Sequence, residues 1–225
     1  MLVTGASRGL GRAIAEGFAA EGARLVVTAT DGRHLDAVLA AVRGRGAEAH
    51  GVGLDLADGA SCAAAGAEAL GALGRLDVLV NNASLLGERA DLADADMDVF
   101  DRVMAVNVGG TLRLTQAVLS GMADGGAIVN VTSGAAARAT WGAYAVSKHA
   151  LDGATVMLRD ELAPRGIRCV AVNPGGLRTA MRAAAYPGED PATLPRPESV
   201  VPVFVAIAEG ADPGPHVNAK DWTPA

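Results

Sequence analysis

Tyr144 and Lys148 stand four positions apart in the stretch Tyr-Ala-Val-Ser-Lys. Residues at this spacing lie on one face of a helix, so the phenol and the ammonium group can reach the same substrate atom. An unperturbed tyrosine, with a pKa of about 10, is too weak a base near neutral pH. Lowering that pKa by about three units takes roughly 4 kcal/mol, and one cation about 4 Å away at an effective dielectric of about 20 supplies a similar amount. The pair therefore predicts proton transfer to or from a substrate oxygen, unless the spacing is a coincidence of helix composition.

Two polar residues in apolar surroundings extend this set. Ser133 closes the β-branched run 129–132, where its hydroxyl either holds a substrate oxygen beside Tyr144 or caps a turn. Asn107 lies within a long apolar stretch of helical periodicity, where a polar residue with poor helix propensity is out of place. That position favours a functional role for Asn107.

A glycine-rich loop, Thr-Gly-Ala-Ser-Arg-Gly-Leu-Gly, occupies residues 4–11. It joins an apolar strand to a helix whose inward face carries Ile14 and Phe18. Glycines allow a tight turn and a close approach of the backbone to a pyrophosphate, which the helix N-terminus then stabilises. In this context the loop predicts dinucleotide binding, although an ordinary glycine turn has the same composition.

Further motifs follow successive predicted strands: Asp55-Leu56, Asn81-Asn82-Ala83 and Asn173-Pro174-Gly175. Together with the Gly-x-x-x-Gly-x-Gly spacing, they make residues 2–180 resemble the classical short-chain dehydrogenase/reductase family. Ser84 departs from that family's Asn-Asn-Ala-Gly turn. The resemblance implies an NAD(P)H-dependent oxidoreductase that transfers hydride between nicotinamide and a carbonyl or alcohol carbon.

The resemblance also implies roles for individual residues. The catalytic four are Asn107, Ser133, Tyr144 and Lys148, with Asn107 holding a water that links Lys148 to solvent. The implied cofactor contacts are Gly5, Ser7, Arg8, Gly9, Leu10, Gly11, Asp55, Leu56, Asn81, Ala83, Tyr144, Lys148, Pro174, Gly175 and Thr179. No metal is expected, because the histidines and the two cysteines show no ligand spacing.

The end of the second predicted strand bears on cofactor choice. Ala29 falls where NAD-preferring relatives carry aspartate, and Arg8 resembles the basic residue of NADP-preferring ones. Against this, Thr30 stands where many NADP-preferring relatives place arginine, and Asp31 would repel a phosphate if it pointed inward. We expect NADP, with NAD as the alternative.

Short β-branched runs alternate with longer Ala/Leu-rich stretches, a pattern typical of repeated βα units. We predict one α/β domain over 1–225, a doubly wound, Rossmann-like parallel sheet with helices on both faces. The expected strands are 1–4, 24–29, 48–54, 77–82, 127–132, 167–173 and a weak 215–219. The expected helices are 10–21, 33–43, 60–71, 95–121, 143–163 and 197–209.

Two regions depart from this pattern. The opening strand has only three residues before Thr4, which leaves open whether the N-terminus is complete. The prolines in 182–197 preclude a long helix and predict a substrate flap. Substrate specificity would lie in this flap, in 84–95 and in 134–142, where Trp141 either packs on a substrate ring or anchors the loop.

Composition restricts the partners. A net charge of −6 with scattered arginines argues against nucleic acid binding. The start lacks a secretory signal pattern and no later segment resembles a membrane span, so we expect a cytoplasmic protein. Apolar residues surround much of the predicted helices 95–121 and 143–163, and with the resemblance they predict a homodimer or homotetramer.

Two other functions use the same motifs. A non-catalytic dinucleotide-binding sensor or scaffold fits the fold, which does not itself decide function. An epimerase or dehydratase fits less well, because the region after Gly175 leaves little room for a sugar-nucleotide domain. The combination of Ser133, Tyr144 and Lys148 favours an enzyme acting on a small-molecule carbonyl or alcohol, whose identity and direction of reaction stay open.

Overall fold

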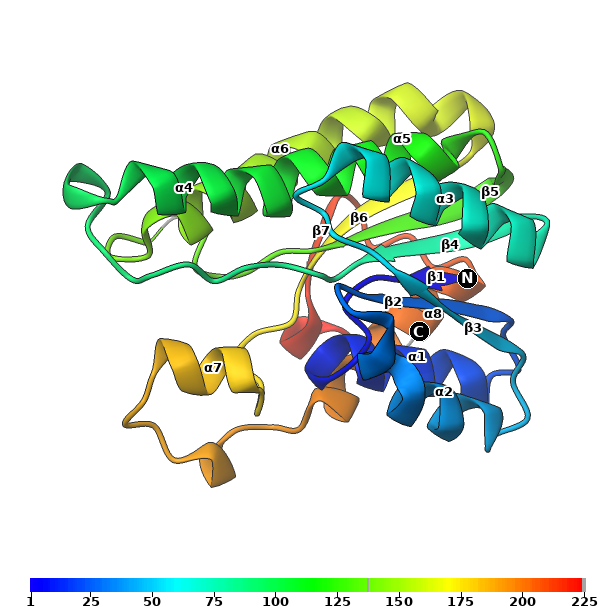
Figure 1. Cartoon of the computed structure of the whole chain (residues 1–225), viewed down its shortest axis with the longest axis horizontal. Coiled ribbons are helices and arrows are strands. Elements are labelled where there is room, and N and C mark those ends of the chain that lie inside the picture. The colour runs from blue at the N-terminus through cyan, green and yellow to red at the C-terminus, as the bar shows by residue number, and fades with distance from the viewer. Residues whose placement is uncertain (137, 224–225) are drawn as a thin grey trace.

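The computed structural model describes residues 1–136 and 138–223. Its centre is a seven-stranded parallel sheet in the order β3-β2-β1-β4-β5-β6-β7 (Figure 1). The strands are β1 (Leu2–Val3), β2 (Leu25–Ala29), β3 (Ala49–Gly53), β4 (Leu76–Asn81), β5 (Met122–Val131), β6 (Arg168–Asn173) and β7 (His216–Asn218). This doubly wound sheet confirms the predicted fold. The strand order reverses at β1, between β2 and β4, and ligands bind at such a reversal, beside the carboxyl ends of the strands.

Helices cover both faces of the sheet (Figure 1). One layer holds α1 (Gly9–Ala20), α2 (Asp36–Arg43) and α8 (Val201–Glu209). The other holds α3 (Gly59–Leu73), α4 (Met97–Met104), α5 (Thr111–Leu119) and α6 (Gly142–Leu162). A short helix, α7 (Ala180–Ala185), stands apart from both layers.

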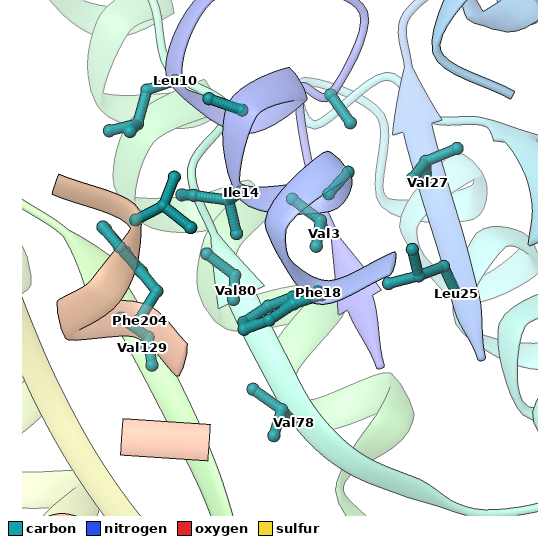
Figure 2. Close-up of a cluster of buried hydrophobic side chains, with 14 of the residues drawn as sticks. Val3, Leu10, Ile14, Phe18, Leu25, Val27, Val78, Val80, Val129 and Phe204 are labelled. Atoms are coloured by element: carbon teal, nitrogen blue, oxygen red, sulfur yellow. The ribbon is translucent and has the colours of Figure 1, made fainter. Parts of the chain in front are cut away.

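Alternation along the strands divides the core in two. In β1, Leu2 packs into the cluster under α3 and α5, whereas Val3 packs into the cluster under α1 and α8. Figure 2 shows Val3 with Phe18 of α1 and Phe204 of α8 in this second cluster. Both residues of β1 are fully buried, so two residues suffice for a central strand that is paired on both edges and covered on both faces.

The predicted single helix 95–121 is three elements. A π-helical stretch, Ala105–Gly110, separates α4 from α5 and contains Asn107. Gly110 at its end packs against the backbone that follows β3, since a Cβ there would lie 2.1 Å from the carbonyl oxygen of Leu56. Single π turns inside helices are frequent at functional sites, and this one brings Asn107 to the candidate site.

The predicted loop 182–197 also needs a correction, because α7 extends into it as far as Ala185. The Thr179 hydroxyl caps this helix by accepting a hydrogen bond from the backbone N–H of Arg182 at 3.2 Å. Pro187, Pro191 and Pro195 keep the rest from continuing as helix. Other boundaries differ by a few residues; β5, for example, begins at Met122 instead of 127.

Candidate active site

A cavity of about 700 Å³ opens at the carboxyl ends of the strands. Most of the predicted site residues line it. They are Gly5, Ser7, Arg8, Gly9, Leu10, Asp55, Leu56, Ala83, Ser133, Tyr144, Lys148, Pro174, Gly175 and Thr179. The structure therefore brings residues from six segments of the chain to one cavity, whereas Gly11, Asn81 and Asn107 do not line it.

The glycine loop forms the turn between β1 and α1. Gly5 and Gly9 adopt φ values of +64° and +58°, which favour glycine. The N-cap of α1, Arg8, makes no side-chain capping bond, so the N–H groups of the first turn can face an anion in the cavity. Gly11 has a packing role, because a Cβ there would lie 2.4 Å from the carbonyl oxygen of Gly5.

Asn82 holds this loop against β4, a role that the sequence analysis missed. Its Nδ2 donates to the carbonyl oxygens of Thr4 at 2.9 Å and Gly5 at 3.2 Å. The Thr4 hydroxyl accepts the backbone N–H groups of Asn82 and Ala83, both at 3.0 Å. Asn81, predicted as a cofactor contact, instead points into the core, where it donates to Thr115 and Asn130.

The part of the cavity at the end of β2 is lined by Arg8, Ala29 and Thr30. Asp31 does not line it, because its carboxylate caps the next turn and accepts the Arg33 guanidinium at 2.6 Å. The hydrogen bonds from Arg33 lower the pKa of Asp31. The carboxylate of Asp31, which would otherwise repel a phosphate, is thus paired with a positive charge.

Lys148 lies one helical turn after Tyr144 on α6, with its side chain buried. Its Nζ donates to the carbonyl oxygen of Val131 at 2.8 Å and lies 5.6 Å from the centre of the Tyr144 ring. Burial lowers the pKa of Lys148 to about 8, and the negative charge of Asp152 opposes this decrease.

Burial raises the pKa of the Tyr144 phenol, and a hydrogen bond with Ser133 partly offsets the increase. This direction is opposite to the one expected from Lys148, whose ammonium group is hydrogen-bonded to Val131. A buried tyrosine with a raised pKa is neutral and carries a proton at neutral pH. The arrangement therefore presents a proton donor to the cavity, with the Ser133 hydroxyl beside it.

Asn107 joins the π turn to two other segments. Its Oδ1 accepts the N–H of Leu85 at 2.7 Å, and its Nδ2 donates to the carbonyl oxygen of Leu85 and to Ser147 Oγ, both at 2.9 Å. The Ser147 hydroxyl in turn donates to the carbonyl oxygen of Tyr144 at 2.8 Å. The Asn107 side chain thus ties the segment after β4 to the turn of α6 that carries Tyr144.

The wall next to Tyr144 is mostly apolar. Leu86, Trp141 and Ala185 pack in one cluster with Tyr144, and the cavity lining also includes Leu85, Met181 and Ala184. Trp141 both lines the cavity and anchors its loop, since its side chain packs against Tyr144 and Tyr186 with ring centres 5.8 and 5.7 Å apart. The predicted specificity segment 134–142 includes Ala137, which lies outside the described residues.

Other types of site find little support. Across 1–136 and 138–223, no cluster of His, Cys, Asp and Glu side chains could hold a metal ion. None of the helices in the described part is long and apolar enough to cross a membrane.

The fold and the cavity define an α/β protein of the dinucleotide-binding oxidoreductase class, and comparison with known proteins specifies the family. The family model for short chain dehydrogenases matches residues 1–190. The chain belongs to the short-chain dehydrogenase/reductase family of enzymes, as its motifs predict.

Relatives match over most of their length. The oxidoreductase YciK of Escherichia coli K12 is 37% identical over 215 residues, which cover 91% of this chain and 84% of YciK. The 3-oxoacyl-[acyl-carrier-protein] reductase FabG of Aquifex aeolicus is 37% identical over 187 residues, which cover 81% of this chain and 75% of FabG. A short chain dehydrogenase of Escherichia coli CFT073, solved as a complex with NADPH, superposes with a TM-score of 0.91 at 36% identity, covering 97% of this chain and 95% of that one.

Proposed function

We propose that this chain is an NADPH-dependent carbonyl reductase, able to run in reverse as an alcohol dehydrogenase, with Tyr144 as general acid and base. The observation that carries the proposal is the buried phenol of Tyr144, one helical turn from Lys148, at a cavity lined by Ser133 and a glycine loop. The relatives solved with NADP and NADPH support the choice of cofactor.

The cavity fits a dinucleotide with a 2′-phosphate. The uncapped N–H groups of α1 would hold the pyrophosphate, and Arg8 would meet the 2′-phosphate at the end of β2. Asp31 does not oppose the phosphate, because Arg33 pairs with it. Thr28 also lines the cavity, and its buried hydroxyl has no partner within the described residues.

The bound cofactor would supply hydride to the carbonyl carbon. Tyr144 gives its phenolic proton to the carbonyl oxygen, and the Ser133 hydroxyl holds that oxygen against it. Lys148 stabilises the phenolate that results through its positive charge, once its ammonium group turns from the carbonyl of Val131 towards the cavity. Solvent then returns a proton to Tyr144. Asn107 keeps the helix turn of Tyr144 in register with the segment after β4.

A titration of the purified protein with NADPH and NADH, followed by oxidation rates with ketones, diketones and aldehydes, tests the proposal. Tighter binding of NADPH and carbonyl-dependent oxidation are expected. Binding without turnover on any carbonyl would favour the alternative, a dinucleotide sensor on the same fold. Tighter binding of NADH would overturn the assignment of NADP.

We further propose one catalytic domain over 1–225, of which 224 and 225 lie outside the described residues, with 182–197 as its substrate flap.

Exposed apolar side chains on α4 and α6, above all Met97 and Met157, support a homodimer or homotetramer formed through these helices. The two cysteines, Cys62 and Cys169, are buried and unpaired, which is consistent with the reducing cytoplasm.

A further inference from the structure

Arg89 joins the three segments that surround the substrate end of the cavity. It lies in the segment after β4, and its Nη1 donates to the carbonyl oxygen of Ala185 in α7 at 3.2 Å. Its Nη2 donates to the hydroxyl of Thr140, in the connection before α6, also at 3.2 Å. The guanidinium also lies 4.8 Å from the ring centre of Trp141 and 5.0 Å from that of Tyr186. One side chain thus holds α7 and the Trp141 connection together.

The backbone at this junction is strained. Thr140 has a φ of +66°, the single positive value of a non-glycine residue among those that the structure describes. This conformation is unfavourable for a β-branched residue and persists only where its surroundings impose it. The hydrogen bond from Arg89 to the Thr140 hydroxyl is one such contact, and it lies next to Trp141 in the chain.

Trp141 lines the cavity, and its side chain is packed against two tyrosine rings. Its ring contacts Tyr144 on one side and the edge of Tyr186 on another, and only 8% of the residue is exposed. Arg182, the arginine of α7 that lines the cavity, is paired with Glu189 through two hydrogen bonds of 2.6 Å. Its charge is therefore already compensated.

These contacts restrict the substrate. The cavity lining includes leucine, methionine, alanine and tryptophan side chains, together with Ser84, Arg178 and Arg182. The Arg178 guanidinium donates to the carbonyl oxygens of Ala192 and Leu194, both at 3.2 Å, so both arginines already have protein partners. A polyhydroxylated or carboxylated compound would leave polar groups without partners beside the apolar side chains of this wall, which weakens its binding. A flat apolar group has no polar atoms that would lose hydrogen bonds to water when it binds against such a wall.

We propose, on the basis of the carbonyl reductase function above, that the site selects neutral, compact carbonyl compounds with aryl or alkyl flanks. In this arrangement Arg89 is a positioning residue: it keeps α7 and Trp141 closed as the apolar wall beside Tyr144.

The first test compares kcat/KM with NADPH for acetophenone, fructose and pyruvate, using the whole chain. We expect acetophenone to be favoured by about 100-fold or more. If fructose or pyruvate were the better substrate, the substrate class would be wrong while the reductase function stood. NADPH binding with no turnover on any carbonyl would overturn the reductase function itself.

The second test replaces Arg89. Arg89→Met keeps the aliphatic stem but removes both hydrogen bonds and the cation over Trp141. We expect KM for acetophenone to rise about tenfold and the preference for it over bulkier aryl ketones to fall, with unchanged NADPH affinity. Arg89→Lys, which restores a positive charge but lacks the planar guanidinium group, should recover part of the lost KM and substrate preference. Arg75→Met, at an exposed arginine that precedes β4 and lies at the opposite end of the strands from the cavity, is the control and should behave as wild type.

Trp141 fluorescence provides a readout that does not depend on turnover. In a Trp222→Phe background Trp141 is the remaining tryptophan, and the indole N–H of Trp222 has no partner among the described residues to lose. Arg89→Met should shift the Trp141 emission to the red as the wall opens to water. Wild-type emission, KM and selectivity in Arg89→Met would overturn the positioning role of Arg89.

Discussion

Tyr144 is held in a neutral state by its own burial. Because burial raises its pKa and the hydrogen bond with Ser133 only partly offsets this, the phenol keeps its proton across the physiological range. That state suits proton donation to a carbonyl oxygen. Proton removal from an alcohol needs additional positive charge near the phenol, which Lys148 can supply if its ammonium group moves from the Val131 carbonyl towards the cavity.

Tyr144→Phe tests the proposed proton transfer. Loss of the hydroxyl removes the donor but keeps the ring that packs on Trp141, so the fold and the cofactor cavity should persist. We expect turnover to fall by about 100-fold or more while NADPH affinity stays nearly unchanged. Steady-state kinetics and a fluorescence titration measure the two effects. Turnover within a few fold of wild type would mean that another group donates the proton.

Lys148→Met should abolish activity and make the folded protein more stable at neutral pH. The pKa of about 8 in the folded chain lies below the ordinary 10.5, so the folded protein binds fewer protons than the unfolded chain between these values. The free energy of unfolding therefore rises with pH across this window, and the cost of burying the charge, about 3 kcal/mol, is complete below it. Subtracting about 1 kcal/mol for the lost hydrogen bond to Val131 leaves a gain of about 2 kcal/mol at neutral pH.

Urea unfolding at neutral pH and at pH 10.5 measures this difference. The variant should be inactive, and its advantage should shrink at the higher pH, where the wild-type lysine is neutral in the folded chain. Lys220→Met, at an exposed lysine, is the control and should leave stability unchanged at both values. A variant less stable than wild type at neutral pH would show that the ammonium group contributes more than its burial costs.

Residues were predictable from the sequence where their chemistry depends on local spacing. Tyr144 and Lys148 share a helix face, and Ser133 ends a strand, so their convergence follows from the predicted elements. Arg89 could not be found in this way, because its partners lie 51 and 96 positions away and its own neighbours carry no pattern. Asn82 was visible as part of a motif, but only the structure separates it from the core-facing Asn81.

At the scale of elements, the sequence predicts the sheet and its helices, because the spacing of apolar residues along a strand or a helix depends on which of its faces are buried. It does not predict the break in 95–121, since the apolar residues of a π turn continue into the next helix without an interruption. The turn is a consequence of tertiary contacts: the close approach of Gly110 to Leu56 and the hydrogen bonds of Asn107. The helix α7 was missed for a different reason: its cap on Thr179 is local, but the helix is only six residues long and the prolines that follow it indicate a loop.

Two glycines of α3 allow a matched test of helix packing. A Cβ at Gly66 would lie 2.8 Å from the Cβ of Ala117 in α5, so Gly66→Ala should destabilise the protein by about 1 to 3 kcal/mol through overpacking. At Gly71 a Cβ meets no atom within 4 Å, so Gly71→Ala should stabilise by about 0.5 to 1 kcal/mol through helix propensity. Urea denaturation compares the two; equal effects would mean that α3 and α5 separate freely.

At the scale of the whole molecule, α4 and α6 lie side by side at the surface and leave large apolar groups uncovered (Figure 1). Met97 on α4 is 59% exposed and Met157 on α6 is 63% exposed. The residues proposed for catalysis, Ser133, Tyr144 and Lys148, converge within one chain, so we expect each subunit to keep this set when the helices pair. Oligomerisation and activity should therefore be separable by mutation.

Met157→Glu should dissociate the proposed oligomer without abolishing NADPH binding. A carboxylate placed in an apolar interface loses its hydration without gaining a partner, which costs several kcal/mol and is enough to shift a micromolar association to monomers. Light scattering of the wild type and the variant measures the mass. Met181→Glu, at an exposed methionine of α7, is the control and should keep the wild-type mass. A wild-type protein that is already monomeric at micromolar concentration would remove the proposed oligomer, and an oligomeric variant would place the interface on another surface.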